Sequence, residues 1–337
     1  MVTHVQFRRI SMSLSSEVSD YSPAGKWSVR LAFFIGTYVL ISFFLSPATF
    51  LTLGLIYVDK FARAVPILLV GSAAVAGLLY GRDAPTKYAI NWVRTRWWNC
   101  LPVLLFFLAG VTAFSNFKIL IPTVLPFYAD TWLADLDEWI HRAAPWELAH
   151  RLDNGLWASF IFNIYEVVWF AQWFGTILLV GMWSNPIARI RYLWSVALTI
   201  SIVGTLLALL LSSAGPIYYD HFIGGDRFAG LKVALAGLES SVVVREYADY
   251  LLMLYTTGHT GLGGGISAMP SLHVALVVLN AFFLSSLNRW AGAAGWIFAG
   301  LILYGSVYTG WHYAVDGYVA IAVVWVIWWA TGRLVRE

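Results

Sequence analysis

The sequence predicts an all-α integral membrane protein that crosses the bilayer about eight times. The chain has 337 residues, of which 60% are hydrophobic and only 12% are charged, and its mean hydropathy is +0.72. A soluble domain usually carries about 25% charged residues. Tryptophan is abundant, with 18 residues, as expected where many side chains lie at the lipid–water boundary. Together these observations predict a polytopic helical membrane protein.

Eight apolar runs approach or exceed the roughly 20 residues that a helix needs to cross the hydrocarbon core. In chain order the predicted spans are Leu31–Tyr57, Val65–Tyr80, Trp97–Phe117, Trp157–Met182, Tyr192–Ser213, Ser271–Leu287, Trp290–Tyr308 and Trp311–Ala330. The second and the sixth are the shortest. The first is far longer than a signal-peptide core and lacks a small-residue cleavage site, so we expect it to be retained.

The spans divide the chain into four predicted segments. Residues 1–27 are polar and serine-rich and are expected to form a disordered cytoplasmic tail. Residues 28–96 form an N-terminal addition of two spans, residues 97–332 a six-span catalytic core, and residues 333–337 a short cytoplasmic tail.

The basic residues predict the orientation of these spans. With the N-terminus inside, most of the 21 Lys and Arg residues lie in inner segments, as the positive-inside rule requires. Both termini then face the cytoplasm. The same orientation places His273 and His312 together at the outer face, which is periplasmic, lumenal or extracellular.

Two predicted outer loops are long. The first contains apolar residues at helical spacing, namely Trp132, Leu133, Leu136, Trp139 and Ile140. Acidic residues (Asp130, Asp135, Asp137 and Glu138) lie largely between them, which predicts an amphipathic helix on the outer surface. The second loop holds the glycine-rich segment Gly258–Gly265, which is either a flexible connector or a segment that lets the backbone approach a phosphate closely. Its position just before Ser271 favours the close approach.

Composition also excludes several classes of function. The formal net charge of +3 is too small to indicate nucleic-acid binding. Cys100 is the single cysteine, so an internal disulfide is excluded. The chain has no clustered set of carboxylate, cysteine and histidine ligands, so we expect neither a metal nor another cofactor. The oligomeric state is left open.

Two short strings near the C-terminus carry the chemistry. Met269-Pro270-Ser271-Leu272-His273 and His312-Tyr313-Ala314-Val315-Asp316 each stand where an apolar run begins. Residues four apart share a helix face, so Asp316 is expected to hold one imidazole nitrogen of His312. Two histidines are sufficient for metal-free phosphoryl transfer, because one attacks phosphorus and the other protonates the leaving oxygen.

These strings resemble the signatures of the type 2 phosphatidic acid phosphatase superfamily. Residues Gly263 to Asn280 contain its Pro-Ser-x-His signature, and Tyr308 to Tyr318 contain the His-x-x-x-Asp end of the next signature. The similarity is greatest to the branch of inositol phosphorylceramide synthases and sphingomyelin-synthase-like lipid phosphotransferases. Phe114 through Lys118 and Pro126 to Asp137 also look like this branch, as does Ser213-Ala214-Gly215-Pro216. The resemblance covers roughly the last two-thirds of the chain.

The sequence departs from the phosphatase signatures at two arginine positions. Ser306 stands where the third signature has arginine, six residues before His312, and it follows Gly305. In the first signature, Lys118 and Pro126 match but Leu125 replaces arginine. A phosphodiester carries less charge than a monoester, so a site that handles diesters fits the missing cations better.

Four further residues are candidates for substrate binding, each with a structural alternative. Ser271 is either a helix cap or a phosphate ligand, and the two roles are compatible. Lys118 either binds phosphate or extends from a span end to the interface. Glu166 either contacts a headgroup or acceptor or fixes packing through a tyrosine or tryptophan. Arg227 is either a phosphate ligand or an ordinary loop residue.

The resemblance and the spacing together predict a lipid phosphotransferase. His312 is the expected nucleophile, Asp316 orients it, and His273 acts as general acid and then as general base. A phospholipid donor and a lipid or polyol acceptor are the expected partners. The alternatives are a lipid phosphate or polyprenyl diphosphate phosphatase, and a non-enzymatic lipid-binding or transport protein.

Overall fold

The computed structural model describes residues 23–81, 83–151, 154–183 and 185–335. Helices dominate these ranges, and no strand occurs in them, so the predicted all-α class is confirmed. The predicted tail over residues 1–27 lies mostly outside the described residues. Its last part does not, because the first helix already begins at Pro23.

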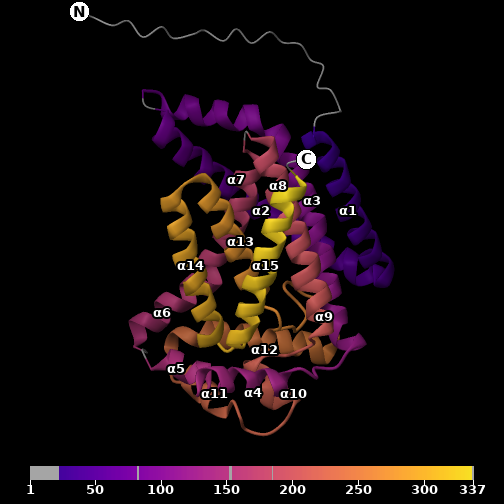
Figure 1. The fold of residues 1–337 in the computed structure, drawn as a ribbon, viewed down its shortest axis with the longest axis vertical. Coiled ribbons are helices and arrows are strands. Elements are labelled where there is room, and N and C mark those ends of the chain that lie inside the picture. Colours follow the sequence, from indigo (N-terminus) through magenta and orange to yellow (C-terminus); the bar gives the residue numbers. More distant parts are fainter. Residues whose placement is uncertain (1–22, 82, 152–153, 184, 336–337) are drawn as a thin grey trace, which may run out of the picture.

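The membrane bundle consists of long apolar helices that run between two ends of the molecule (Figure 1). They are α1 (Pro23–Leu45), α2 (Pro47–Tyr80), α3 (Pro85–Val124), α6 (Gly155–Asn163) continuing through the π-helix η1 (Ile164–Val168) into α7 (Trp169–Gly181), α8 (Pro186–Ser201) continuing through the π-helix η2 (Ile202–Leu207) into α9 (Ala208–Leu210), α13 (Leu272–Leu287), α14 (Arg289–Tyr308) and α15 (Ala314–Leu334). Among the described residues, seven helical segments are long and apolar enough to cross a membrane, and α13 is a shorter apolar helix of 16 residues.

The boundaries of the first two predicted spans are wrong. The run Leu31–Tyr57 is broken at Ser46, and α2 then continues without interruption through Val65 to Tyr80. Proline lacks a backbone N–H and disfavours helical backbone in the preceding residue, so Pro47 ends α1 and starts α2. Hydropathy alone did not reveal this break, because the residues on both sides are apolar.

A layer of short helices covers one end of the bundle, which we call the site end. Its elements are α4 (Asp130–His141), α5 (Pro145–His150), α10 (Pro216–Phe222), α11 (Ala229–Ala236), the 3-10 helix η3 (Glu239–Ser241) and α12 (Val242–Thr257). In Figure 1 this layer lies at the bottom, and the C-terminal end of α15 lies at the top. The predicted amphipathic helix is thus present as α4, and the second long loop is itself largely helical.

The apolar core has two main parts. One lies within the bundle and includes most of the buried face of α13, such as Val274 and Phe283. The other lies between the site-end layer and the bundle and includes Leu133, Leu231 and Tyr308. The packing of the second part fixes the layer over the end of the bundle.

Helix α13 begins inside the bundle rather than at its surface. A helix of 16 residues extends only about 24 Å, which is less than the hydrocarbon thickness. The chain before it passes close to α3, where an added Cβ at Gly265 would lie 2.8 Å from the carbonyl carbon of Lys118. Gly265 also has a φ of +90°, which favours glycine. His273, the second residue of α13, is therefore recessed beneath the site-end layer.

Candidate active site

The structure brings His273 and His312 together from different helices. Their ring centroids are 5.9 Å apart, with an interplanar angle of 61°. His273 belongs to the first turn of α13, and His312 lies in the turn between α14 and α15. The predicted juxtaposition of the two motifs is therefore present.

His312 contacts Asp316 through a helix cap and not along a helix face. Nδ1 of His312 lies 3.2 Å from Oδ2 of Asp316, but α15 begins only at Ala314. The same Oδ2 accepts a hydrogen bond from the backbone N–H of Tyr313 at 3.0 Å. The expected pairing is correct, whereas the expected geometry is wrong, because the turn that contains Gly310 at φ +76° delays the helix start. With Nδ1 engaged, Nε2 is the nitrogen of His312 left for chemistry.

The two histidine segments are also joined through their backbones. Ser271 caps α13, and its hydroxyl oxygen accepts a hydrogen bond from the N–H of Val274 at 3.4 Å. The N–H of Ser271 itself donates to the carbonyl oxygen of Asp316 at 3.2 Å. Among the described residues, the N–H groups of Leu272 and His273 have no acceptor. They form a helix N-terminus of the kind that binds anions.

Asp137 of α4 occupies the N-terminus of α15. Its two carboxylate oxygens accept hydrogen bonds from the N–H groups of Ala314 at 2.8 Å and Val315 at 3.0 Å. Asp137 is only 3% exposed. A carboxylate at a helix N-terminus satisfies unpaired amides and interacts favourably with the helix dipole. This contact fixes the start of α15, and with it Asp316 and the turn that carries His312.

Asp130, seven residues before Asp137, makes a second such contact. Its carboxylate accepts hydrogen bonds from the N–H groups of Ala214 at 2.8 Å and Gly215 at 2.9 Å, and from the hydroxyl of Tyr313 at 2.8 Å. Burial raises the pKa of both Asp130 and Asp137, and the amide hydrogen bonds act in the opposite direction. Asp130 thereby ties the segment before α10 to the residue that follows His312.

The Ser213–Gly215 segment in turn supports the chain before His273. The carbonyl oxygen of Ser213 accepts a hydrogen bond from the N–H of Ala268 at 2.9 Å, and its hydroxyl oxygen accepts one from Met269 at 2.9 Å. Gly215 has a φ of +89°, and an added Cβ there would lie 2.6 Å from the carbonyl oxygen of Trp311. Only glycine allows this close approach, so both histidine segments rest on one short turn.

The His273 ring lies between aromatic side chains of η1 and α7. Its centroid is 4.1 Å from that of Trp169 and 5.1 Å from that of Tyr165, with the Tyr165 ring nearly parallel at 19°. Trp169 also donates from its indole N–H to the carbonyl oxygen of His273 at 3.2 Å. Within the described ranges, the ring nitrogens of His273 make no hydrogen bond, so they are available to a substrate.

Lys118 is the predicted cation that the structure brings to this site. It lies within α3 (Pro85–Val124), close enough to His273 for their charges to interact. Helix α3 continues beyond the predicted span end at Phe117, and Lys118 is partly buried within it. In the part of the chain that the structure describes, its ammonium group makes no hydrogen bond or ion pair. A partly buried ammonium without a protein partner is well suited to an anionic ligand.

The other two predicted substrate contacts have protein partners. Glu166 in η1 lies close enough to Trp311 for the two side chains to interact. Arg227 pairs with Asp135 at 2.7 Å and with Glu138 at 3.0 Å on the exposed side of helix α4. The structure gives Arg227 no contact with His273, His312 or Asp316. It therefore joins two elements of the site-end layer.

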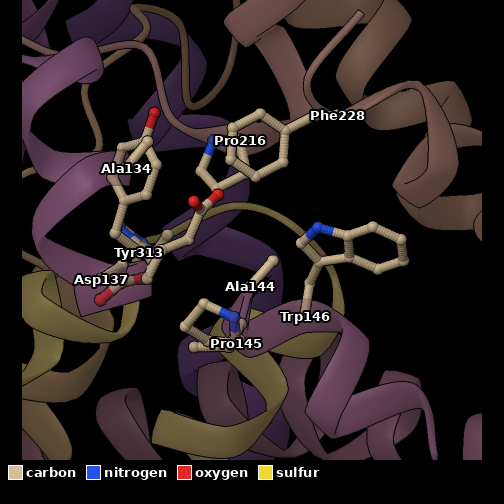
Figure 2. Close-up of a pocket in the computed structure, with 11 residues that line it drawn as sticks. Ala134, Asp137, Ala144, Pro145, Trp146, Pro216, Phe228 and Tyr313 are labelled. Carbon is tan, nitrogen blue, oxygen red and sulfur yellow. The ribbon is translucent and has the colours of Figure 1, made fainter. Parts of the chain in front are cut away.

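A small cavity of about 10 Å³ lies on the layer side of His312. Figure 2 shows Asp137 and Tyr313 on one side of this cavity and Trp146 on the other. Such a volume accommodates about one water molecule. The layer therefore covers this side of the histidine pair closely.

The inward face of α4 carries acidic as well as apolar side chains. Leu133 and the two carboxylates of Asp130 and Asp137 face inward, whereas Trp139 is 69% exposed. Backbone amides beneath the layer need acceptors, and the carboxylates of Asp130 and Asp137 supply them. The seven-residue spacing of Asp130 and Asp137 places both on one helix face, and this spacing was the available signal.

Comparison with known proteins identifies the family of this fold. No curated protein and no solved structure matches the chain. The family model described as PAP2 superfamily matches residues 131–330, which is more than half of the chain and includes both histidine motifs. The chain therefore belongs to the PAP2 superfamily, and this membership supports a function of the lipid phosphatase or phosphotransferase type.

Proposed function

We propose that this protein is a membrane lipid phosphotransferase. It moves a phosphoryl-headgroup from a phospholipid donor to a hydroxylated lipid or polyol acceptor, and a phosphohistidine is the intermediate. The observation that carries the proposal is the contact of His312 with Asp316 at 3.2 Å beside the unpaired ring of His273. This arrangement supplies a nucleophile, an orienting carboxylate and a proton carrier.

The reaction proceeds in two displacements at phosphorus. Nε2 of His312 attacks, the bond from phosphorus to the glycerol oxygen breaks, and His273 donates a proton to that oxygen. His273 then takes the proton from the acceptor hydroxyl, whose oxygen attacks phosphorus and displaces His312. Asp316 holds the Nδ1 proton of His312 throughout and stabilises the ring when it carries positive charge.

The balance of charge supports transfer from a phosphodiester. Ser306, at one missing arginine position, is fully buried and donates its hydroxyl to the carbonyl oxygen of Leu303 at 2.7 Å. Leu125, at the other, supplies only an apolar side chain. Lys118 and the N–H groups of Leu272 and His273 remain as donors to phosphate oxygens. This set suits a diester monoanion better than a monoester dianion.

The cover over the site supports a lipid hydroxyl, and not water, as the acceptor. The cavity on the layer side of His312 holds about 10 Å³, so bulk water does not reach the histidines through it. A lipid acceptor instead approaches from within the membrane. The resemblance to inositol phosphorylceramide synthases and sphingomyelin-synthase-like enzymes supports a sphingolipid or another hydroxylated lipid in this role.

A lipid phosphate or polyprenyl diphosphate phosphatase is the second candidate. It uses the same three catalytic residues with water as the acceptor. The unpaired ammonium of Lys118 favours this candidate, because its positive charge suits a monoester dianion. A non-enzymatic lipid-binding or transport protein has no need of the His312–Asp316 contact. Both forms of the enzyme are proposed to act without a metal and at the outer face.

The deciding experiment is product analysis by mass spectrometry. Purified protein is incubated with phospholipids labelled in the headgroup, with and without a panel of hydroxylated lipid and polyol acceptors. The proposal expects a new headgroup-bearing lipid that appears only with an acceptor and disappears in His312→Ala. Release of inorganic phosphate from phosphatidic acid at a rate unaffected by acceptors indicates the phosphatase. Absence of any phosphorus-containing product indicates the non-enzymatic alternative.

A further inference from the structure

Tyr165 has a buried hydroxyl group that the mechanism does not yet use. The side chain is only 2% exposed, and its hydroxyl oxygen has no hydrogen-bond partner among the described residues. Buried hydroxyl groups are almost always paired, because leaving one unpaired is costly. An exception beside a reactive histidine indicates a group that finds its partner in the substrate.

The position of Tyr165 is consistent with that role. Its ring stacks on His273 at 5.1 Å and 19°. It is also close enough to Asp316 and Glu166 to interact with their charges. Tyr165 lies in the π-helix η1, and such interruptions of α-helices occur frequently at functional sites. The hydroxyl therefore belongs to the same enclosed region as the catalytic residues.

The space for the Tyr165 ring is provided by Gly305 of α14. An added Cβ at Gly305 would lie 3.1 Å from Cδ2 of Tyr165 and 3.4 Å from its Cβ. The next residue, Ser306, stands where the phosphatase signature has arginine, and its hydroxyl is engaged by Leu303. The turn of α14 that lacks the arginine is thus the turn against which Tyr165 packs.

We propose that the Tyr165 hydroxyl donates a hydrogen bond to a non-bridging oxygen of the substrate's phosphorus and strengthens it in the transition state. This inference rests on the proposed phosphoryl chemistry at His312. The tyrosine keeps its proton, so each displacement step stays balanced as written above. A neutral donor stabilises the developing charge without adding a cation, which matches a diester with a single negative charge.

The test compares Tyr165→Phe with Tyr192→Phe. Both substitutions remove one hydroxyl from a fully buried tyrosine and keep the ring. The hydroxyl of Tyr192 already donates to Asn280 at 2.5 Å, away from the histidines. Tyr165→Phe is expected to lower kcat by roughly 10- to 100-fold with little change in KM, because the lost contact acts mainly in the transition state. Tyr192→Phe is expected to retain kcat.

A phosphorothioate substrate, in which sulfur replaces one non-bridging oxygen, distinguishes a direct hydrogen bond from a structural role of Tyr165. Sulfur is a weak hydrogen-bond acceptor. For one diastereomer of a phosphorothioate donor, replacing oxygen by sulfur is therefore expected to lower the rate of the wild-type enzyme by a larger factor than it lowers the rate of Tyr165→Phe. The donor is whichever lipid phosphate the wild type turns over; for a monoester, whose thiophosphate phosphorus is not stereogenic, the single thio-substituted compound replaces the two diastereomers. Unchanged sulfur effects for both diastereomers in Tyr165→Phe overturn the inference, and point to a water-mediated contact with the unpaired Oδ1 of Asp316.

Vanadate binding separates this inference from the proposed function. Vanadate adopts the five-coordinate geometry of phosphoryl transfer, and its binding, followed by calorimetry, needs no turnover. Wild type and Tyr192→Phe are expected to bind it equally, and Tyr165→Phe roughly 10- to 100-fold more weakly. If Tyr165→Phe binds vanadate with wild-type affinity, the inference about Tyr165 is overturned and the proposed function is not. Absence of binding in every variant, wild type included, overturns the phosphoryl site and the Tyr165 inference with it.

Discussion

Asp137 and Ala314 are joined by a hydrogen bond of 2.8 Å from the backbone N–H to the carboxylate. The bond crosses from the site-end layer to the first residue of α15, two residues after His312. The layer therefore acts as more than a cover. It holds the backbone that carries His312 and Asp316.

Replacing Asp137 with alanine is expected to reduce both stability and activity. The change leaves the N–H groups of Ala314 and Val315 buried without acceptors, at about 1–3 kcal/mol each. A shift of His312 by about 1 Å would lower kcat by about 100-fold. Asp135→Ala is the matched control, because Asp135 is on the same helix but 64% exposed and pairs only with Arg227. Thermal unfolding and initial rates measure both effects, and equal behaviour of the two variants would contradict the proposed support.

The proposed covalent step predicts an order of activity among variants of His312 and Asp316. His312→Ala removes the nucleophile and is expected to abolish turnover. Asp316→Asn keeps the nucleophile but misorients the ring, with an expected loss of about three to four powers of ten, as for orienting carboxylates in serine proteases. Full activity in His312→Ala would falsify the mechanism.

His273→Ala is expected to have a different signature. A donor with an activated leaving group needs no protonation, so the variant should still phosphorylate His312 but fail to activate the acceptor. The intermediate should then accumulate and appear as an acid-labile mass increase on the peptide that contains His312. An unlabelled peptide in His273→Ala, with a label in the wild type, would argue against the assigned role of His273.

Lys118→Gln tests the one predicted cation found beside the histidines. Loss of a charge-assisted contact to phosphate is expected to lower kcat/KM by roughly 10- to 100-fold, and by more for phosphatidic acid than for a phosphodiester. Lys232→Gln is the control, since Lys232 pairs with Asp220 at 3.2 Å in the site-end layer. Similar kcat/KM values for the two variants would remove Lys118 from the site.

The missing arginines predict the choice of donor. Each absent charge-assisted hydrogen bond weakens binding of a monoester dianion by about 1.5–3 kcal/mol, and Leu125 and Ser306 account for two. Phosphodiester lipids are therefore expected to exceed phosphatidic acid as donors in competition assays that follow both products. Faster release of inorganic phosphate from phosphatidic acid would favour the phosphatase.

The orientation in the membrane is tested by cysteine labelling in intact cells, in a Cys100→Ala background. Glu239→Cys lies in the site-end layer and Asp83→Cys in the turn between α2 and α3, and both positions are exposed. The basic-residue bias predicts that an impermeant maleimide labels position 239 and not position 83. The opposite pattern would place the histidines at the cytoplasmic face.

The sequence by itself determined the all-α membrane class and the two histidine motifs. These features are local, because neighbouring residues specify the length of an apolar run, a helix cap such as Ser271 and the spacing within a motif. The break at Pro47 is equally local, but an apolar run on both sides concealed it.

Only the tertiary structure decided how the site is assembled. Lys118, Tyr165 and Asp137 come from three different elements and reach the histidines through helix packing, which no single segment specifies. Asp130 and Asp137 are buried because they pair with backbone amides of other elements, which the sequence of α4 does not specify. The His312–Asp316 contact depended on a turn that delays the start of α15. Long-range contacts pair the hydrogen-bonding groups of distant backbone and side chains, and which groups require partners depends on how the elements pack together.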